Sequence, residues 1–297
     1  MLGVTRAAVW KRLAALLARG VQLERLRGRG YRLAQPLELL DAERIQAGLR
    51  PDIRSAIQEL RVDFCVDSTS QRLLHTPDGH GRVLLAEYQT HGRGRRGNNW
   101  SSPLASGICL SLGWRLDPAP AGAGALSILA GAALVRALLR FGIGNIGLKW
   151  PNDLVFNGGK LGGLLIESRA QAAGPMDVVI GVGVNVRLPD NIQVEGDNRP
   201  VDLSQCCPRL PSRNDVAGAM VEELMDMLAA LAVDRAGDYL AQWRRYDVGI
   251  GHDGVLRMPT GTLSGRVLGI SDAGLLRLSV DGVDREFSSG DLSLRVI

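Results

Sequence analysis

The order of strand-like and helix-like segments is the feature that most constrains the fold of this chain. Six strand-like segments occur in neighbouring groups, at residues 60–66, 83–88, 107–114, 146–150, 161–168 and 178–186. Apolar residues at helical spacing mark residues 125–141, 214–232 and 236–246. Strict alternation of strands and helices would predict a doubly wound sheet, whereas grouped strands favour an α+β fold. We therefore expect an α+β domain over most of the chain.

The C-terminal residues have a different pattern. After residue 250, short strand-like segments alternate with Gly and Asp turns, at residues 255–258, 263–270, 275–280, 284–287 and 293–297. The pair Asp281-Gly282 is typical of a tight hairpin. We predict a small all-β barrel there, and hence three domains, at residues 1–36, 37–249 and 250–297.

The N-terminal residues predict a helix followed by a β-hairpin. Thr5 can cap a helix that runs to Arg19, and Gly20 can end it. Strand-like segments at 21–27 and 31–33 then flank a basic Gly-Arg-Gly turn. A helix followed by a basic hairpin is the second half of a winged helix-turn-helix. Because only four residues precede Thr5, we expect this DNA-binding unit to be partial.

Positive charge is concentrated in the same segment. Residues 1–33 hold eight Lys or Arg and one acid, a net charge of +7, whereas the whole chain of 297 residues has +4. The remaining residues therefore sum to −3. A basic head on a mildly acidic body indicates contact with nucleic acid. The candidate residues are Thr5, Arg6, Lys11 and Arg29; the alternative is a solvated basic helix face.

Residues 92–97, with the sequence GRGRRG, match the G-x-G-x-x-G pattern of dinucleotide-binding folds. We reject that interpretation because the dinucleotide motif must open a helix, and the following NNWSSP does not begin one. One arginine side chain can donate two parallel hydrogen bonds to two oxygens of a phosphate. Glycine lets the backbone fold tightly around an anion. The segment therefore predicts an anion-binding loop. A basic surface loop and a nucleic-acid contact remain the alternatives.

Three further segments place polar residues next to strands. KWPND at 149–153 offers side chains suited to a base, a ribose or Mg²⁺, and Lys160 lies between two Gly pairs where a ligand can approach. Asn185 is an amide in an apolar strand and needs a partner, adenine being one candidate. Hydroxyls cluster in DSTS at 67–70, which alone would be an ordinary capping turn. Together these segments predict a nucleotide site in an α+β domain.

Cysteine, histidine and hydropathy patterns narrow the setting. The four cysteines show no metal-ligand spacing and the four histidines are scattered, so we expect no zinc site. No run approaches the roughly 18 apolar residues of a membrane span. We expect a cytoplasmic protein in a reducing compartment, without secretion or membrane insertion.

Taken together, four motifs resemble those of the bacterial bifunctional biotin–protein ligases that also repress the biotin operon. In order along the chain they are EYQTHGRGRRG at 87–97, KWPNDL at 149–154, KLGG at 160–163 and GVGVN at 181–185. The resemblance covers nearly the whole chain. It implies a central mixed sheet with helices on one side, similar to class II synthetases, a partial winged helix-turn-helix and a C-terminal SH3-like β-barrel.

The resemblance also implies a reaction. The carboxylate of biotin attacks the α-phosphorus of MgATP to form biotinyl-5′-AMP. A lysine of the biotin carboxyl carrier protein of acetyl-CoA carboxylase then takes the biotinyl group. ATP, Mg²⁺ and biotin are thus the expected cofactors and substrate. Operator DNA and a second copy of the chain, in a ligand-linked homodimer, are further expected partners.

Roles for individual residues follow from the same resemblance. The catalytic residues would be Lys160, Arg93 and Arg95. The biotin-binding residues would be Ser68, Thr69, Ser70, Gln89, Arg93, Gly94, Arg95 and Lys160. The adenylate-binding residues would be Trp100, Lys149, Asn152 and Asn185, and no metal ligand is assigned. Ser70 departs from the family pattern, which usually has Asn there; Ser keeps a hydroxyl but lacks the reach of an amide.

Two alternatives stay open. A lipoate– or octanoate–protein ligase would share the main-domain fold, although the arginine loop and the C-terminal barrel favour biotin. A ligand-sensing repressor without catalysis would keep the N-terminal unit, although Lys160 and the arginine loop favour an enzyme.

Overall fold

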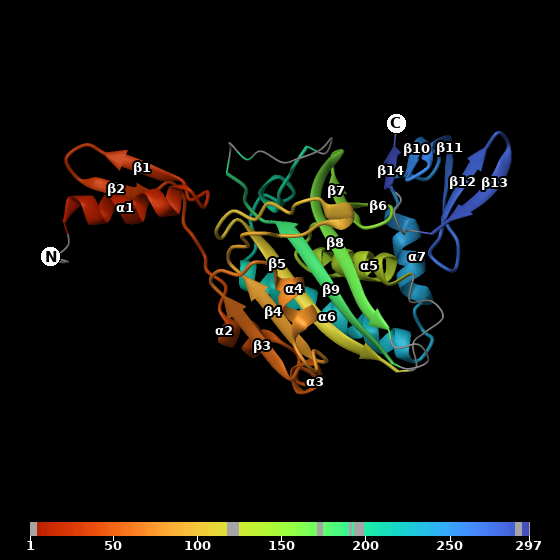
Figure 1. The fold of residues 1–297 in the computed structure, drawn as a ribbon, viewed down its shortest axis with the longest axis horizontal. Helices are drawn as coiled ribbons and strands as arrows, with labels where there is room; N and C mark the ends of the chain where they lie inside the picture. Colours follow the sequence, from red (N-terminus) through yellow and green to blue (C-terminus); the bar gives the residue numbers. More distant parts are fainter. Residues whose placement is uncertain are drawn as a thin grey trace.

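The structure is a computed structural model that describes residues 5–117, 125–170, 175–189, 192, 199–288 and 293–296. Three sheets follow one another along the chain, with two, seven and five strands (Figure 1). The seven-stranded sheet mixes parallel and antiparallel pairs and is packed with helices, which confirms the predicted α+β class. The three domain boundaries stay a prediction.

The N-terminal segment forms the predicted helix and hairpin, set to one side of the main body (Figure 1). Its elements are α1 (Arg6–Leu17), β1 (Leu23–Leu26) and β2 (Gly30–Leu33). The Thr5 side chain caps α1 by accepting a hydrogen bond from the Ala8 amide. No residue of α1 is buried, and the apolar side chains of Val9 and Leu17 are 40% and 43% exposed.

The central sheet has the strand order β3-β4-β5-β9-β8-β7-β6. Its strands are β3 (Glu59–Asp63), β4 (Arg82–Ala86), β5 (Gly107–Leu116), β6 (Gly147–Lys149), β7 (Asp153–Phe156), β8 (Gly159–Ala170) and β9 (Met176–Asn185). Of the described pairs of neighbouring strands, β3 and β4 run parallel and the others run antiparallel. The sequence predicts six of these strands. Strand β7 was not predicted because its first three residues are all buried, so its sequence shows no alternation of apolar and polar residues.

Helices α5 and α6 pack together and cover one face of this sheet. The helices are α2 (Ala42–Gly48), α3 (Pro51–Ala56), α5 (Leu126–Leu139), α6 (Arg213–Ala232) and α7 (Gly237–Tyr246), with a 3₁₀ turn η3 (Leu203–Gln205). Ile108, Leu110 and Leu112 of β5 belong to the core beneath them. The three helices predicted at 125–141, 214–232 and 236–246 are confirmed, each within two residues.

One short helix, α4 (Thr69–His75), packs against β5 and β9 on the opposite face. Ser68 is its N-cap. The predicted capping turn is therefore present, and it opens a helix that is too short to show helical periodicity in the sequence. Ser111, which alternates along β5 with the core residues, donates from Oγ to Thr69 Oγ1 at 2.8 Å. This hydrogen bond therefore holds the first residue of helix α4 against the sheet.

The C-terminal sheet has the order β13-β12-β11-β10-β14, and all its pairs are antiparallel. Its strands are β10 (Asp253–Met258), β11 (Gly261–Ile270), β12 (Leu276–Val280), β13 (Val283–Phe287) and β14 (Ser293–Val296). These confirm the five predicted strands. The segment that leads into this sheet contacts the central one, where Val248 N donates to Leu148 O of β6 at 3.0 Å.

Candidate active site

A cavity of about 880 Å³ opens between the start of α4, the loop at 93–101, strands β7 to β9 and the C-terminal sheet. All twelve residues predicted to bind a ligand line it: Ser68, Thr69, Ser70, Gln89, Arg93, Gly94, Arg95, Trp100, Lys149, Asn152, Lys160 and Asn185. Folding thus brings segments from residue 68 to residue 185 around one space. The role of each residue stays a prediction.

The arginine loop, residues 92–100, is a tight hairpin. Trp100 N donates to Gly92 O at 2.8 Å, and Gly94 N donates to Asn98 O at 2.8 Å. The 3₁₀ turn η1 (Arg95–Gly97) forms its tip, where Arg96 has a φ of 58°. The next element is β5 and not a helix, which confirms that the GRGRRG segment is no dinucleotide fingerprint.

The indole of Trp100 lies directly on the backbone of β9. A Cβ atom at Gly183 would approach Trp100 Cε2 to 2.4 Å, and a Cβ atom at Gly92 would approach Trp100 O to 2.4 Å. Neither distance is compatible with van der Waals contact. The two glycines therefore allow the arginine loop to close down on the sheet.

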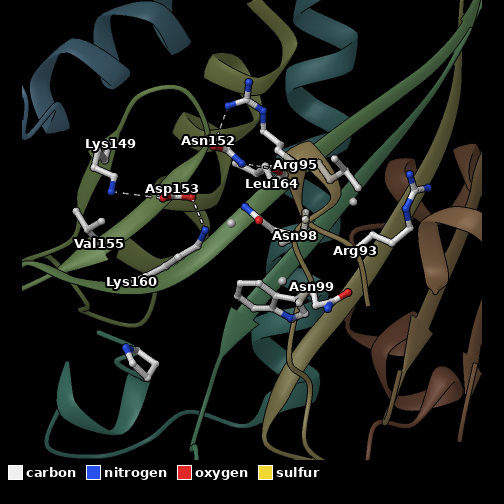
Figure 2. Close-up of a pocket in the computed structure, with 18 of the residues that line it drawn as sticks. Arg93, Arg95, Asn98, Asn99, Lys149, Asn152, Asp153, Val155, Lys160 and Leu164 are labelled. Carbon is white, nitrogen blue, oxygen red and sulfur yellow. Dashed lines mark hydrogen bonds and ion pairs between the residues drawn. The ribbon is translucent and has the colours of Figure 1, made fainter. Parts of the chain in front are cut away.

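Two lysines and one aspartate form what we call the charged end of the cavity: Lys149, Asp153 and Lys160. Lys160 Nζ lies 2.6 Å from Asp153 Oδ1, and Lys149 Nζ lies 3.7 Å from Asp153 Oδ2 (Figure 2). The chain has only one other lysine, Lys11. Two positive charges share one carboxylate, so the cluster keeps a net positive charge that an anionic ligand can balance.

Asn152 connects the charged end to the arginine loop. Its Oδ1 lies 3.5 Å from Arg95 Nη1, and its Nδ2 donates to Leu164 O at 2.6 Å (Figure 2). Asn185, by contrast, finds its partner in the backbone, because its Nδ2 donates to Val201 O at 2.9 Å. That bond holds the segment that pairs with Lys160, whose N donates to Arg199 O at 2.8 Å.

Four uncharged side chains, none more than 9% exposed, form what we call the neutral end: Ser68, Thr69, Ser70 and Gln89. Gln89 Oε1 accepts from Thr69 N at 2.8 Å and from Thr69 Oγ1 at 3.2 Å. Ser68 Oγ and Ser70 Oγ are 3.3 Å apart. The site therefore offers a buried set of hydrogen-bonding groups without charge.

The register of β8 and β9 sets the distance between the two ends. Gly163, whose Cβ would lie 3.3 Å from Lys160 Nζ, pairs with Gly183. Gly181, whose Cβ would lie 3.5 Å from Ser70 Cβ, is two residues away on the same strand. At about 3.4 Å per residue, the two ends are offset by roughly 7 Å along the strand direction.

Arg93 points away from the charged end (Figure 2). Its Nη1 lies 2.7 Å from Oε1 of Glu167 in β8, a side chain that is 15% exposed. Of the two arginines predicted to hold the ligand anions, Arg95 thus borders the charged end, whereas Arg93 is held by a carboxylate.

Sequence reasoning misses four contributors to the site. Asp153 was recognisable, because it ends the KWPND motif. Glu167 lies on β8 with no motif around it. Arg257 and Arg295 come from the C-terminal sheet and reach the cavity lining only through the tertiary fold.

Among the described residues, cysteine thiols and metal-ligand side chains add no chemistry to this site. Burial raises the pKa of the Cys109 thiol to about 11, so it is protonated near neutral pH and is no nucleophile. Over the described ranges, no three His, Cys, Asp or Glu side chains gather as a metal site would require. None of the helices that the structure describes is long and apolar enough to cross a membrane.

The residues predicted to contact nucleic acid lie outside the cavity, on the N-terminal unit. Thr5 caps α1, Arg6 and Lys11 belong to α1, and Arg29 lies at the hairpin tip. All four are exposed. Their role stays a prediction.

Comparison with known proteins adds to this geometry. The Biotin/lipoate A/B protein ligase family matches residues 63–185, and the Biotin protein ligase C terminal domain matches residues 255–295. Bifunctional ligase/repressor BirA of Salmonella typhimurium is 33% identical over 99% of this chain and 90% of that protein. A biotin–[acetyl-CoA-carboxylase] ligase of Mycobacterium tuberculosis is 36% identical over 72% of this chain and 79% of that protein. The biotin protein ligase from Aquifex aeolicus in complex with biotin and ATP is similar with a TM-score of 0.70 at 25% identity, covering 81% of this chain and 100% of that chain.

The chain therefore belongs to the biotin protein ligase family. Within that family, the similarity to bifunctional ligase/repressors extends along 99% of this chain, which includes the N-terminal unit. The resemblance seen in the four motifs is thereby confirmed.

Proposed function

We propose that this protein is an ATP-dependent biotin–protein ligase that transfers biotin to a lysine of the biotin carboxyl carrier protein of acetyl-CoA carboxylase. The observation that carries the proposal is one cavity with a neutral hydrogen-bonding end and a charged end, offset by roughly 7 Å along β9. A molecule with an uncharged polar ring and a carboxylate tail, activated by a nucleotide, matches that arrangement.

The first step joins two anions. A carboxylate oxygen of biotin attacks the α-phosphorus of ATP, the bond to the bridging oxygen breaks, and pyrophosphate leaves. Lys160, Arg95 and Arg93 screen the negative charges and hold the reactants in line. Asp153 fixes Lys160 Nζ for this task, at 2.6 Å. Arg93 leaves its ion pair with Glu167 and binds the anionic ligand instead.

The second step transfers the biotinyl group. The amine of the carrier lysine attacks the carbonyl carbon of biotinyl-5′-AMP, the carbon–oxygen bond to the phosphate breaks, and AMP leaves as the amine gives up a proton. The mixed anhydride must be kept from water until the carrier arrives. The arginine loop, closed down on β9 by Trp100, provides that shield.

Mg²⁺ would enter with ATP. Asp153 is the only carboxylate among the described residues that line the cavity, and two lysines already neutralise it. The described lining residues therefore offer no cluster of carboxylates for a metal ion. Mg²⁺ would be coordinated by phosphate oxygens and water, which are ligands that it prefers.

A carrier-modification assay tests the proposal. Purified protein receives ATP, either biotin or lipoate, and the matching carrier domain; an avidin blot or a mass shift reads the product. Lipoate is included because the matched family includes lipoate ligases. We expect transfer of biotin. Transfer of lipoate alone would replace the proposal with a lipoate–protein ligase.

The N-terminal unit supports a second function. Residues 1–33 carry a net charge of +7, and α1 and the hairpin expose Arg6, Lys11 and Arg29. We also propose biotin-dependent binding of operator DNA, by a ligand-linked homodimer. A gel shift on the biotin-operon region, with and without biotin plus ATP, and sedimentation under the same conditions test both points. If the DNA stays unbound and the protein stays monomeric under all conditions, the protein is a ligase without this second function.

A further inference from the structure

Beneath the neutral end lies a buried serine that the proposed reaction does not use. Ser111 of β5 is fully buried, and its Oγ donates to Thr69 Oγ1 at 2.8 Å. We propose that Ser111 is a positioning residue: through Thr69 it fixes which atoms of the neutral end donate and which accept. The inference rests on the proposed function, in which this end binds the ring of biotin.

The direction of each hydrogen bond can be derived. A backbone N–H can only donate, so the Gln89 side-chain atom that lies 2.8 Å from Thr69 N is the oxygen Oε1. Oε1 only accepts, so the Thr69 hydroxyl, 3.2 Å away, spends its single hydrogen there. Thr69 Oγ1 is then left with lone pairs. One accepts from Ser111, and the other can face the cavity.

The same reasoning orients the amide of Gln89. With Oε1 committed to Thr69, the two hydrogens of Nε2 remain for a ligand or the loop beside it, and a Cβ atom at Gly92 would lie 3.0 Å from Nε2. The neutral end therefore presents an acceptor at Thr69 and donors at Gln89. A cyclic urea carries an N–H next to a C=O and is complementary to both. A dithiolane ring has neither group and would leave buried donors unpaired.

Ser111 begins a chain of hydrogen bonds that gives the neutral end a defined set of donors and acceptors. The bonds from Ser111 to Thr69 and from Thr69 to Gln89 run in one direction, and such chains strengthen each member. Without Ser111, the Thr69 hydroxyl loses the donor that anchors its oxygen and can turn. Ser68 Oγ accepts from Gln71 N as the cap of α4, but the bond between Ser68 and Ser70 can run either way, because either hydroxyl can donate across the 3.3 Å that separates them. The Thr69 hydroxyl thus donates to Gln89 and accepts from Ser111, and Ser111 holds its oxygen in place.

The first test compares Ser111→Ala with wild type in carrier biotinylation. We expect the KM for biotin to rise roughly 3- to 10-fold, the effect of losing about one net hydrogen bond, while kcat and the KM for ATP stay within about 2-fold. Ser111→Cys, which keeps a weak donor, should recover part of the loss and covers the case in which the alanine variant does not fold. Ser106→Ala is the matched control, a buried serine whose hydroxyl donates to Pro103 O at 2.7 Å.

The second test is a double-mutant cycle with Thr69→Val. Because Ser111 acts through Thr69, adding Ser111→Ala to Thr69→Val should change the KM for biotin by less than about 2-fold. Independent, multiplying effects of the two substitutions would overturn the inference. So would an equal rise in the KM values for biotin and ATP, which a purely structural role predicts.

The two proposals fail in different ways. A wild-type protein that transfers no biotin would overturn the proposed function together with this inference. A wild-type protein that is active, with a Ser111→Ala variant whose KM for biotin is unchanged, would overturn the inference alone.

Discussion

The two ends of the cavity use different side chains for different tasks. The neutral end holds four short or planar side chains, none more than 9% exposed, and the hydrogen bonds between Thr69 and Gln89 have a fixed direction. The charged end holds two long lysine side chains, 18% and 25% exposed, around one carboxylate. A hydrogen bond weakens steeply when its distance or angle is poor, whereas the interaction between two charges falls off slowly with distance. The neutral end should therefore set which ligand binds, and the charged end how fast it reacts.

Removing Lys160 tests the charged end most directly. We expect Lys160→Ala to lower biotinyl-adenylate formation by at least ~100-fold, because the developing phosphate charge loses a fixed cation of the charged end, while biotin still binds. Pyrophosphate exchange measures the step. Lys11→Ala, which removes the only lysine outside the cavity, is the matched control. Near-normal exchange in Lys160→Ala would contradict the assignment; Arg95→Ala should behave like Lys160→Ala.

Placing a charge in the neutral end tests the other half of the comparison. Gln89→Glu keeps an oxygen for Thr69 but replaces the donors of Nε2 with a carboxylate oxygen. We expect the KM for biotin to rise roughly 10- to 100-fold, since a buried acceptor would face the ring carbonyl. Gln58→Glu, at an exposed position between α3 and β3, should leave this KM unchanged. Equal effects of the two variants would show that the neutral end is not a recognition site.

Trp100 borders both ends, so moving it should affect both. A Cβ atom at Gly183 would come within 2.4 Å of Trp100 Cε2, and overpacking of that kind costs about 1–3 kcal/mol. We expect Gly183→Ala to lower kcat/KM for biotin and for ATP by roughly 10-fold. Gly144→Ala, where the new methyl group meets no atom within 4 Å, is the control. A loss for one substrate only would mean that Trp100 serves a single end.

Asp247 lies behind the charged end, next to Val248 of the cavity lining, and should affect stability more than activity. Burial raises the pKa of Asp247 to about 6. Between pH values of about 4 and 6 the folded protein keeps a proton that the unfolded chain has lost, so the free energy of unfolding falls as pH rises through this window. The expected fall is up to about 3 kcal/mol.

Asp247→Asn should abolish that fall and change kcat near pH 7.5 by less than about 2-fold, because the amide oxygen can still accept from Gly249 N. Urea unfolding at several pH values between 4 and 8 measures the effect. Asp238→Asn on the exposed start of α7 is the control. A pH dependence that survives in Asp247→Asn would assign it to another group.

Local signals in the sequence account for most of the elements and motifs. The cap at Thr5, the long helical periodicities and the Asp281-Gly282 turn each depend on a few neighbouring residues, and each predicts its element correctly. Strand β7 and helix α4 gave no such signal, because the first three residues of β7 are buried without alternation and α4 has only seven residues. Asp153 was within reach, since its motif was already noted.

The sequence alone determined the family, the α+β class and twelve of the residues that line the cavity, because those depend on residue types and their order. Only the tertiary structure decided how these residues divide into two ends. Strand register brings Gly163 and Gly183 together and so fixes the spacing between the ends. Ser111 lies 42 positions from Thr69 and directs it through a bond that no local pattern shows. Contacts between residues distant in the chain come from the packing of whole elements, and hydrogen-bond direction comes from those contacts.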